Sequence, residues 1–460
     1  MDIKAVYFVG IGGIGMSAIA RYFLHQGIVV GGYDRTPSDL TRRLEEEGAQ
    51  VHYEENTDLI PLACKDKDTT LVIYTPAIPA EHKELQFFRQ GSFEIQKRAQ
   101  VLGTLTRAHK GLCVAGTHGK TTTSSMAAHL LHQSPVDCNA FLGGITKNYG
   151  TNYILSSQSD YVVIEADEFD RSFHWLSPYA TVITATDADH LDIYGTEEAY
   201  LESFSHYTSL IVEGGYLLLH TGLKMQPRTG KEVTTFTYSR DEGDFHAENV
   251  RIGGGEITFD YISPLGSIKD IRLGVPVAVN IENGIAAMAL AQIAGVQPDD
   301  IRKAMASFSG VDRRFDFKVK RDDMVYLSDY AHHPEEIRQS ILSIKQLYQG
   351  RRIKAIFQPH LYTRTRDFYR EFADALSQLD DVAIVDIYPA REKPIPGVTS
   401  ALIYDNLTSR HREMIAKNEI LDVVRRGGFD VLITLGAGDI EDYSEQIAQL
   451  LEEGTHNQKG

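Results

Sequence analysis

The stretch Val114-Ala-Gly-Thr-His-Gly-Lys-Thr-Thr-Thr123 places a glycine turn between an apolar run and a helix-like run. A strand, such a turn and a helix that starts near Thr121 form a cradle for phosphate, because backbone N–H groups and the positive end of the helix face the anion. In this arrangement Lys120 reaches the β- and γ-phosphates, and the Thr121 hydroxyl can bind Mg²⁺. The usual pattern has a glycine where this chain has Val114, so the loop is a tightened version. An ordinary glycine-rich turn is the alternative, but Gly-Lys-Thr-Thr at a helix start favours a site for a nucleoside triphosphate.

Length and charge limit the other classes of function. A chain of 460 residues suggests about three domains. The net charge of −17 argues against a non-specific nucleic-acid binder, which needs a basic face. No apolar run approaches the roughly 18 residues of a membrane helix, and the first ten residues resemble a strand rather than a signal peptide. The three cysteines (Cys64, Cys113 and Cys138) form no C-x-x-C pair, which favours a reducing, cytoplasmic setting. No membrane partner is expected, since no apolar run is long enough to span a bilayer.

The N-terminal region has a second glycine turn. An apolar run at residues 5–9 precedes Gly10-Ile-Gly-Gly-Ile-Gly15, a helix is expected at residues 16–25, and a strand at 28–33 ends at Asp34. A G-x-G-x-x-G turn with an acidic residue about 20 positions later is typical of a dinucleotide site. NAD is therefore one possible ligand, and the turn alone does not exclude other diphosphates. A further strand is expected at residues 71–75, and we expect this domain to end near residue 107.

Acidic residues follow two apolar runs of the central region. Glu165 ends a strand expected at residues 161–166, and His190 follows a strand expected at 180–185. A carboxylate at a strand end beside a phosphate cradle would complete the ligands of an ATP-bound Mg²⁺, and His190 could bind a second ion. A solvated acid at 165 and a helix-capping histidine at 190 are the alternatives. We expect Asp167, Glu168 and Asp170 to support the loop, and the histidine spacing does not favour zinc.

Two asparagines open the helix expected at residues 280–294, which follows a β-rich insert at 216–271. Asn280 suits the N-cap of this helix. Alternatively, the carboxamide of Asn280 or Asn283 recognises adenine, because it both donates and accepts hydrogen bonds.

The C-terminal region alternates apolar runs (325–327, 353–357, 382–387 and 431–435) with helix-like segments, and polar motifs follow the runs. This alternation predicts a doubly wound sheet with its site along one edge. Arginines gather in these polar motifs, where they suit the binding of carboxylate or phosphate, although surface arginine is the alternative (Arg313, Arg314, Arg364, Arg366 and Arg391). The predicted fold class is therefore α/β in three domains. They are an N-terminal Rossmann-like domain (1–107), a central P-loop ATPase-like parallel sheet (108–310) and a C-terminal doubly wound Rossmann-like domain (311–460).

Eight motifs spread over the whole chain resemble those of the Mur ligase family, in the family's order. They are Gly10 to Gly15, Gly116-Thr-His-Gly-Lys-Thr121, Glu165-Ala-Asp-Glu168, Asp189-His-Leu-Asp192, Asn280-x-x-Asn283, Arg313-Arg-Phe315, Asp329-Tyr-Ala-His-His-Pro334 and Gln358-Pro-His-x-Tyr-Thr-Arg-Thr365. The sequence departs from the family pattern at Leu361 (usually a basic residue), Val279 (commonly histidine) and Ala331 (frequently glycine). No lysine lies between Lys147 and Lys224, so the carbamylated lysine of some family members has no candidate after His190.

The resemblance implies a place for each substrate. It assigns UDP-N-acetylmuramate, rather than NAD, to the N-terminal domain at Gly12, Gly13, Ile14, Gly15, Asp34, Thr75, Pro76 and Arg98. It assigns ATP to Gly116, Thr117, His118, Gly119, Lys120, Thr121, Thr122, Asn280, Asn283, Arg314 and Asp329. It assigns the amino acid to Tyr330, His360 and Arg364, and two Mg²⁺ ions to Thr121, Glu165 and His190. The implied catalytic residues are Lys120, Glu165, His190 and His360.

The implied reaction joins L-alanine to the lactyl carboxylate of UDP-N-acetylmuramate through an acyl phosphate, and closure of the domains is expected to exclude water. A family member that attaches a whole peptide to the same sugar nucleotide is the alternative enzyme. A nucleotide-binding regulator without turnover is disfavoured, because Lys120, Thr121 and Glu165 are all intact. The expected assembly is a monomer or a weak homodimer.

Overall fold

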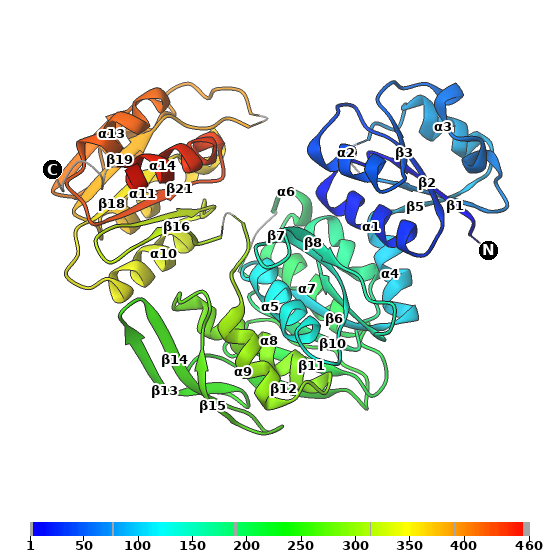
Figure 1. The fold of residues 1–460 in the computed structure, drawn as a ribbon, viewed down its shortest axis with the longest axis horizontal. Helices are drawn as coiled ribbons and strands as arrows, with labels where there is room; N and C mark the ends of the chain where they lie inside the picture. Colours follow the sequence, from blue (N-terminus) through cyan, green and yellow to red (C-terminus); the bar gives the residue numbers. More distant parts are fainter. Residues whose placement is uncertain (1–2, 76–77, 188–190, 313, 391, 454–460) are drawn as a thin grey trace. The chain divides into compact units, whose positions relative to one another are not determined.

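The computed structural model describes residues 3–75, 78–187, 191–312, 314–390 and 392–453. The chain divides into two compact units. Their helices and strands are labelled in Figure 1. The first unit contains residues 1–248, 261–269 and 282–307, and the second contains residues 249–260, 270–281 and 308–460. No helix of the described residues is long and apolar enough to cross a bilayer.

A five-stranded parallel sheet forms the N-terminal part of the first unit, with strand order β3-β2-β1-β4-β5. β1 is buried along its whole length, as expected for a central strand covered on both faces. The strands are β1 (Ala5–Val9), β2 (Val29–Tyr33), β3 (Gln50–His52), β4 (Thr70–Tyr74) and β5 (Glu94–Lys97). The helices are α1 (Ile14–His25), α2 (Asp39–Glu46), α3 (Lys83–Gln90) and α4 (Arg98–Ala108).

The second sheet of this unit has seven strands in the order β12-β11-β10-β6-β9-β7-β8, and only the β7–β8 pair is antiparallel. Its strands are β6 (Lys110–Ala115), β7 (Asn139–Thr146), β8 (Thr151–Ile154), β9 (Tyr161–Glu165), β10 (Ala180–Ile183), β11 (Tyr216–His220) and β12 (Thr234–Tyr238). The helices that follow these strands are α5 (Lys120–His132), α6 (Leu191–Tyr194) and α7 (Glu197–Thr208).

The prediction of one β-rich insert at residues 216–271 was wrong in part. β11 and β12 extend the parallel seven-stranded sheet, because the apolar β11 pairs with β10. Only β13 (His246–Gly253), β14 (Glu256–Ile262) and β15 (Ile268–Arg272) form a separate three-stranded sheet. Two helices follow it, α8 (Val279–Ile293) and α9 (Pro298–Ser307).

The C-terminal sheet of the second unit has the order β16-β17-β21-β18-β19-β20 and is parallel except for β16 at one edge. Its strands are β16 (Asp316–Lys320), β17 (Val325–Asp329), β18 (Ile353–Phe357), β19 (Asp381–Val385), β20 (His411–Ile415) and β21 (Val431–Leu435). Its helices are α10 (Pro334–Leu347), α11 (Tyr362–Leu376), α12 (Ala401–Tyr404), α13 (Ile420–Arg426) and α14 (Ser444–Glu453). The sequence predicted four of these strands, and the structure adds β16 and β20 at the edges.

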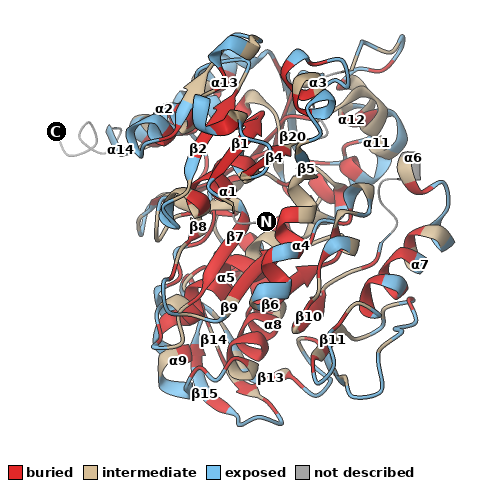
Figure 2. Ribbon diagram, turned by 90° about the vertical axis from the view of Figure 1, so that its right-hand side faces the viewer, coloured by how far each residue is buried: buried red, intermediate tan, exposed pale blue. Residues whose placement is uncertain are grey.

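The predicted α/β fold class is confirmed, with mostly parallel sheets whose central strands are buried (Figure 2). Sites in such sheets form beyond the carboxyl ends of the strands, where the strand order reverses. The two glycine turns lie at such positions, directly after β1 and β6. The exact residue bounds of the three domains stay predictions.

Candidate active site

The turn after β6 has the backbone of a phosphate cradle. Gly116 and Gly119 adopt φ angles of +133° and +78°, a region that L side chains rarely adopt. A Cβ on Gly116 would also collide with the hydroxyl of Thr184, whose Oγ1 donates to the carbonyl of His118. α5 begins at Lys120, so its free N–H groups open onto the turn. The predicted turn-to-helix geometry is therefore present, and Thr122 lies half-buried in the first turn of α5.

Side chains of the turn are held by the segment after β10 and by α7. The Thr117 hydroxyl donates to the carbonyl of Asp187 over 2.8 Å and lies 3.0 Å from the Tyr200 hydroxyl. His118 forms an ion pair with Asp187 when it is protonated, with 3.6 Å between Nε2 and Oδ2. The cradle is thus braced from the β10 side of the sheet.

Thr121 and Glu165 lie together, as predicted for Mg²⁺ ligands. The Thr121 hydroxyl donates to Glu165 Oε1 over 3.0 Å, and the other carboxylate oxygen accepts from the N–H of Gly143 over 3.0 Å. Hydroxyl and carboxylate oxygens are the ligands that Mg²⁺ prefers, usually together with water and substrate phosphate. Among the described residues, no group of three or more His, Cys, Asp or Glu side chains is placed to hold a metal ion. His190 and Pro76, both predicted site residues, lie outside the described residues.

Lys120 is bound inside its own loop. Its Nζ donates to the carbonyl of Gly116 over 2.6 Å and to Glu168 Oε1 over 2.8 Å, and it lies 3.4 Å from the carbonyl of Thr117. The Glu168 side chain is buried, which raises its pKa, whereas the charge of Lys120 lowers it. The expectation that Glu168 supports the loop agrees with this contact.

The two asparagines of α8 differ in their contacts. Asn283 Oδ1 accepts from Thr123 Oγ1 over 3.2 Å, and a Cβ on Gly119 would lie 2.7 Å from this oxygen. Asn283 therefore touches the phosphate cradle. The prediction of Asn280 as an N-cap was wrong, because α8 begins one residue earlier and the Asn280 amide donates to the carbonyl of Val275. A role of either residue in binding adenine stays a prediction.

The glycine turn after β1 also ends at a helix. Gly13 is the N-cap of α1, and Ile14 in the first turn is exposed. Asp34 Oδ2 accepts from the N–H of Gly12 over 2.7 Å, so the predicted acidic residue holds the turn itself. Thr75 directly follows the neighbouring strand β4. Its methyl group would lie 2.8 Å from a Cβ placed on Gly10, so the two segments approach closely. A diphosphate at this turn would face the positive end of α1.

Arg98 lies beside the glycine turn after β1. A Cβ on Gly15 would lie 2.5 Å from Arg98 Nε, which is buried and makes no hydrogen bond. Burial lowers the pKa of the Arg98 guanidinium, and the carboxylates of Asp167 and Glu165 raise it. Arg98 thus lies against the α1 turn within electrostatic reach of the Glu165 carboxylate. A buried donor without a partner at this place suits an anionic ligand group.

A polar cluster near the carboxyl edge of the N-terminal sheet was not predicted. The Tyr7 hydroxyl donates to Glu84 Oε2 over 2.6 Å and lies 2.8 Å from His52 Nε2. Burial raises the pKa of Glu84 to about 7. His82 packs on Tyr33, and both of its buried ring nitrogens lack a hydrogen-bond partner. These residues come from β1, β2, β3, α3 and the residue before α3, so no local sequence pattern unites them.

The predicted amino-acid residues lie together in the second unit. Arg364 Nη1 lies 3.4 Å from His360 Nδ1, and the His360 ring stacks on Tyr388 with 5.8 Å between centroids. His332 joins them, since its ring lies 6.0 Å from that of His360. His360 lies in the loop after β18, and Arg364 lies in the first turn of α11. Leu361, the residue before α11, has a strained φ of +72°.

Tyr330 connects this group to Arg314. The Arg314 guanidinium lies over the Tyr330 ring at 5.4 Å and 3.8 Å from Glu336. Asp329 is buried, and its carboxylate accepts from the N–H groups of Phe315 and Ala331 and from the Ser340 hydroxyl. Burial raises the pKa of Asp329. Asp329 thereby fixes the turns that carry Arg314 and Tyr330, while its contact with ATP stays a prediction. Arg313 and Arg391 lie outside the described residues.

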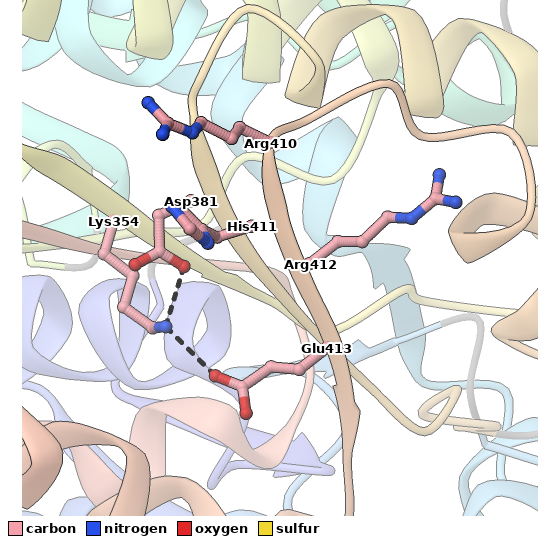
Figure 3. Close-up of a pocket in the computed structure, with 6 residues that line it drawn as sticks. All are labelled: Lys354, Asp381, Arg410, His411, Arg412 and Glu413. Atoms are coloured by element: carbon pink, nitrogen blue, oxygen red, sulfur yellow. Dashed lines mark hydrogen bonds and ion pairs between the residues drawn. The ribbon is translucent and has the colours of Figure 1, made fainter.

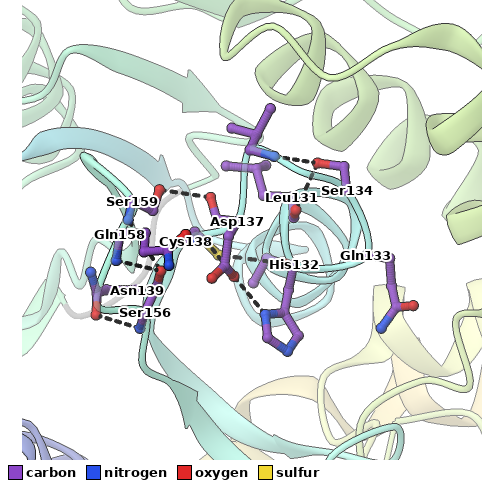
Figure 4. A network of polar contacts seen from close by, with 12 residues as sticks. Leu131, His132, Gln133, Ser134, Asp137, Cys138, Asn139, Ser156, Gln158 and Ser159 are labelled. Atoms are coloured by element: carbon purple, nitrogen blue, oxygen red, sulfur yellow. Dashed lines mark hydrogen bonds and ion pairs between the residues drawn. The ribbon is translucent and has the colours of Figure 1, made fainter.

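The far end of α5 is also fixed by hydrogen bonds (Figure 4). His132 Nδ1 lies 2.6 Å from Asp137 Oδ1, which also accepts from the N–H of Cys138 over 2.8 Å. Ser159 donates to the carbonyl of Asp137 over 2.8 Å. The helix that ends the phosphate cradle is thus anchored to the segment before β9.

One further pocket of about 440 Å³ lies in the C-terminal sheet (Figure 3). In it, Lys354 donates to Asp381 and Glu413 over 2.8 and 3.0 Å. Arg410, His411 and Arg412 complete its lining. Lys354, Asp381 and His411 lie at the amino ends of β18, β19 and β20, away from the strand ends that carry the predicted site. This pocket therefore contains none of the predicted site residues.

Three family models match the chain in succession. The Mur ligase family catalytic domain matches residues 5–110, the Mur ligase middle domain matches 114–291, and the Mur ligase glutamate ligase domain matches 313–454. Together with the relatives described next, they show that the chain belongs to the Mur ligase family, the ATP-dependent ligases that form amide bonds. The resemblance found in the sequence is thus confirmed.

The relatives carry a more specific name. A UDP-N-acetylmuramate–L-alanine ligase of Phocaeicola vulgatus is 67% identical over 98% of both chains. One of Parabacteroides distasonis is 60% identical, again over 98% of both chains. Among solved structures, the UDP-N-acetylmuramate-alanine ligase of Thermotoga maritima matches 98% of this chain and 99% of its own, with a TM-score of 0.78 and 27% identity.

Proposed function

We propose that this protein joins L-alanine to the lactyl carboxylate of UDP-N-acetylmuramate, with conversion of ATP to ADP and phosphate. The observation that carries the proposal is the arrangement around Arg98. This residue lies against the helix turn that suits a diphosphate and within electrostatic reach of Glu165 beside the phosphate cradle. Such an arrangement suits a substrate that has both a nucleotide diphosphate and a carboxylate.

A carboxylate resists attack by an amine because it is negatively charged and oxide is a poor leaving group. In the proposed first step, a lactyl carboxylate oxygen attacks the γ-phosphorus of ATP, and the bond between this phosphorus and the β–γ bridging oxygen breaks to release ADP. The alanine amine then attacks the acyl carbon and loses a proton. The C–O bond breaks, and phosphate leaves. Phosphoryl transfer needs mainly positioning and neutralisation of charge.

In the proposal, residues of the first unit position the nucleotide and the sugar nucleotide and neutralise their charge. Lys120 would bind the β- and γ-phosphates, and Thr121 with Glu165 would hold Mg²⁺, which neutralises phosphate charge when bound. Arg98 would orient the lactyl carboxylate, because its buried Nε has no partner within the protein. The N–H groups at the start of α1 would bind the diphosphate of the sugar nucleotide.

The second unit would bind the amino acid. The planar guanidinium of Arg364 matches a carboxylate, and His360 beside it would orient the substrate. Tyr330, the residue directly after β17, would close the same site.

L-alanine is favoured over a peptide because eight relatives between 43% and 67% identical carry the name of the L-alanine ligase. Murein peptide ligases share the fold, and the one from Psychrobacter arcticus has a TM-score of 0.63 but only 19% identity. We further propose two Mg²⁺ ions in each active site, a cytoplasmic setting, where ATP is available, and a monomer or weak homodimer.

A substrate panel tests the proposal. The purified protein is incubated with ATP, Mg²⁺ and UDP-N-acetylmuramate, together with L-alanine, L-serine, glycine or a peptide that begins with L-alanine. We expect L-alanine to give the highest kcat/KM for phosphate release and a product heavier by one alanine residue. A higher kcat/KM with the peptide would assign the protein to the recycling reaction instead.

A further inference from the structure

All donors of Lys120 are committed within the protein. An ammonium group has three N–H donors, and Nζ of Lys120 has three oxygen neighbours, namely Gly116 O, Thr117 O and Glu168 Oε1. The carboxylate contact is charge-assisted and largely shielded from water, since the two side chains are 16% and 2% exposed. A phosphate oxygen can therefore gain a strong hydrogen bond from Lys120 only if one of these contacts is released.

Glu168 is firmly placed but incompletely bonded. Its carbonyl accepts from the Tyr194 hydroxyl over 2.5 Å and from the N–H of Arg171 over 3.0 Å, which fixes its backbone. Its Oε2 is buried and makes no hydrogen bond. In the next residues (Phe169–Trp175), 3₁₀ structure is interrupted by Asp170 and Arg171, which have left-handed φ angles of +49° and +61°. Strain of this kind is found where the surrounding structure holds a functional group in place.

We propose that Glu168 is a positioning residue that holds Lys120 away from the phosphate site until ATP competes for the ammonium group. The inference rests on the proposed use of ATP. A triphosphate carries more negative charge than one carboxylate, and the flexible lysine stem lets the ammonium group turn from Glu168 towards the nucleotide. The contact would thereby set the affinity for ATP.

The test compares Glu168→Gln with Asp167→Asn in the full chain. Both variants remove one negative charge near the cradle. Asp167, however, is exposed, and its described side-chain hydrogen bond is to the N–H of Phe169 rather than to Lys120. The measurement is the Kd for the non-hydrolysable β,γ-imido analogue of ATP with Mg²⁺, by titration calorimetry. We expect Glu168→Gln to lower this Kd about three- to tenfold, as for loss of a competing charge-assisted contact, and Asp167→Asn to change it less than about twofold.

A double-mutant cycle separates this role from a purely structural one. In a Lys120→Met background, Glu168→Gln should no longer tighten binding, because the competition requires the ammonium group. If Glu168→Gln does not fold, Glu168→Asp provides the test, since its shorter side chain withdraws the carboxylate and should also tighten binding.

Two results would overturn the inference. One is an equal Kd for Glu168→Gln and Asp167→Asn, and the other is weaker binding by Glu168→Gln, which would mean that Glu168 presents Lys120 to the phosphates. Neither result touches the proposed function. Failure of the unaltered protein to bind the analogue would instead contradict the use of ATP.

Discussion

Replacing Lys120 by alanine should lower kcat about 10²- to 10³-fold while the protein stays folded. The variant loses a charge-assisted contact to the phosphates at the stage when charge builds up on the transferred group, and contacts of this kind contribute about 2.7–4 kcal/mol. Steady-state phosphate release measures the effect, and circular dichroism checks the fold.

The controls for this prediction follow from the structure. Lys120→Ala leaves Glu168 buried without its partner, so a second variant, Lys120→Met with Glu168→Gln, removes both charges and avoids this destabilisation. Lys224→Ala is the matched control, because Lys224 is exposed and pairs with Glu197 on the surface. A folded Lys120→Ala protein with nearly normal kcat would contradict the assignment of the phosphate cradle.

Replacing Arg364 by lysine should raise the KM for L-alanine at least about tenfold, which corresponds to ~1.4 kcal/mol. The guanidinium donates two parallel hydrogen bonds to a carboxylate, and an ammonium group cannot reproduce this geometry. Leu361 takes the place of a basic residue common in the family, so Arg364 should provide more of this binding alone. The KM for ATP should barely change.

Arg366→Lys is the matched control for Arg364→Lys. Arg366 lies on the same helix, but it is exposed and pairs with Asp367. A parallel rise of both KM values in Arg364→Lys would show that Arg364 contacts phosphate, and the amino-acid site would then have to be placed elsewhere.

The phosphate cradle could be predicted from the sequence because its geometry is local. The turn after β6 follows from the positions of its glycines, and the helix start follows from the residues after Lys120. The contact between Thr121 and Glu165 could also be expected, because neighbouring parallel strands bring their carboxyl ends to one edge.

Other features depend on contacts between distant segments, which no local pattern encodes. The pairing of Lys120 with Glu168 joins residues 48 positions apart, and the Gly143 N–H that binds Glu165 comes from β7. The Gly143-Gly144 pair within a strand was the one available signal, since glycine in a strand often marks a close approach. Membership of β11 and β12 in the central sheet likewise depends on tertiary pairing rather than on propensity. Asn280 shows how precisely a helix end can be predicted from sequence. The first residue of a helix shifts by one or two positions with the backbone contacts before it.

Transfer of carboxylate oxygen to phosphate tests the central claim most directly. The experiment uses UDP-N-acetylmuramate that carries heavy oxygen at both positions of its lactyl carboxylate. The protein converts this substrate with ATP and L-alanine, and mass spectrometry then analyses the released phosphate. The proposed acyl phosphate requires each phosphate to carry one heavy oxygen from the carboxylate, in step with formation of the amide. Amide product accompanied by unlabelled phosphate would contradict this account, because the carboxylate would then have been activated by another route.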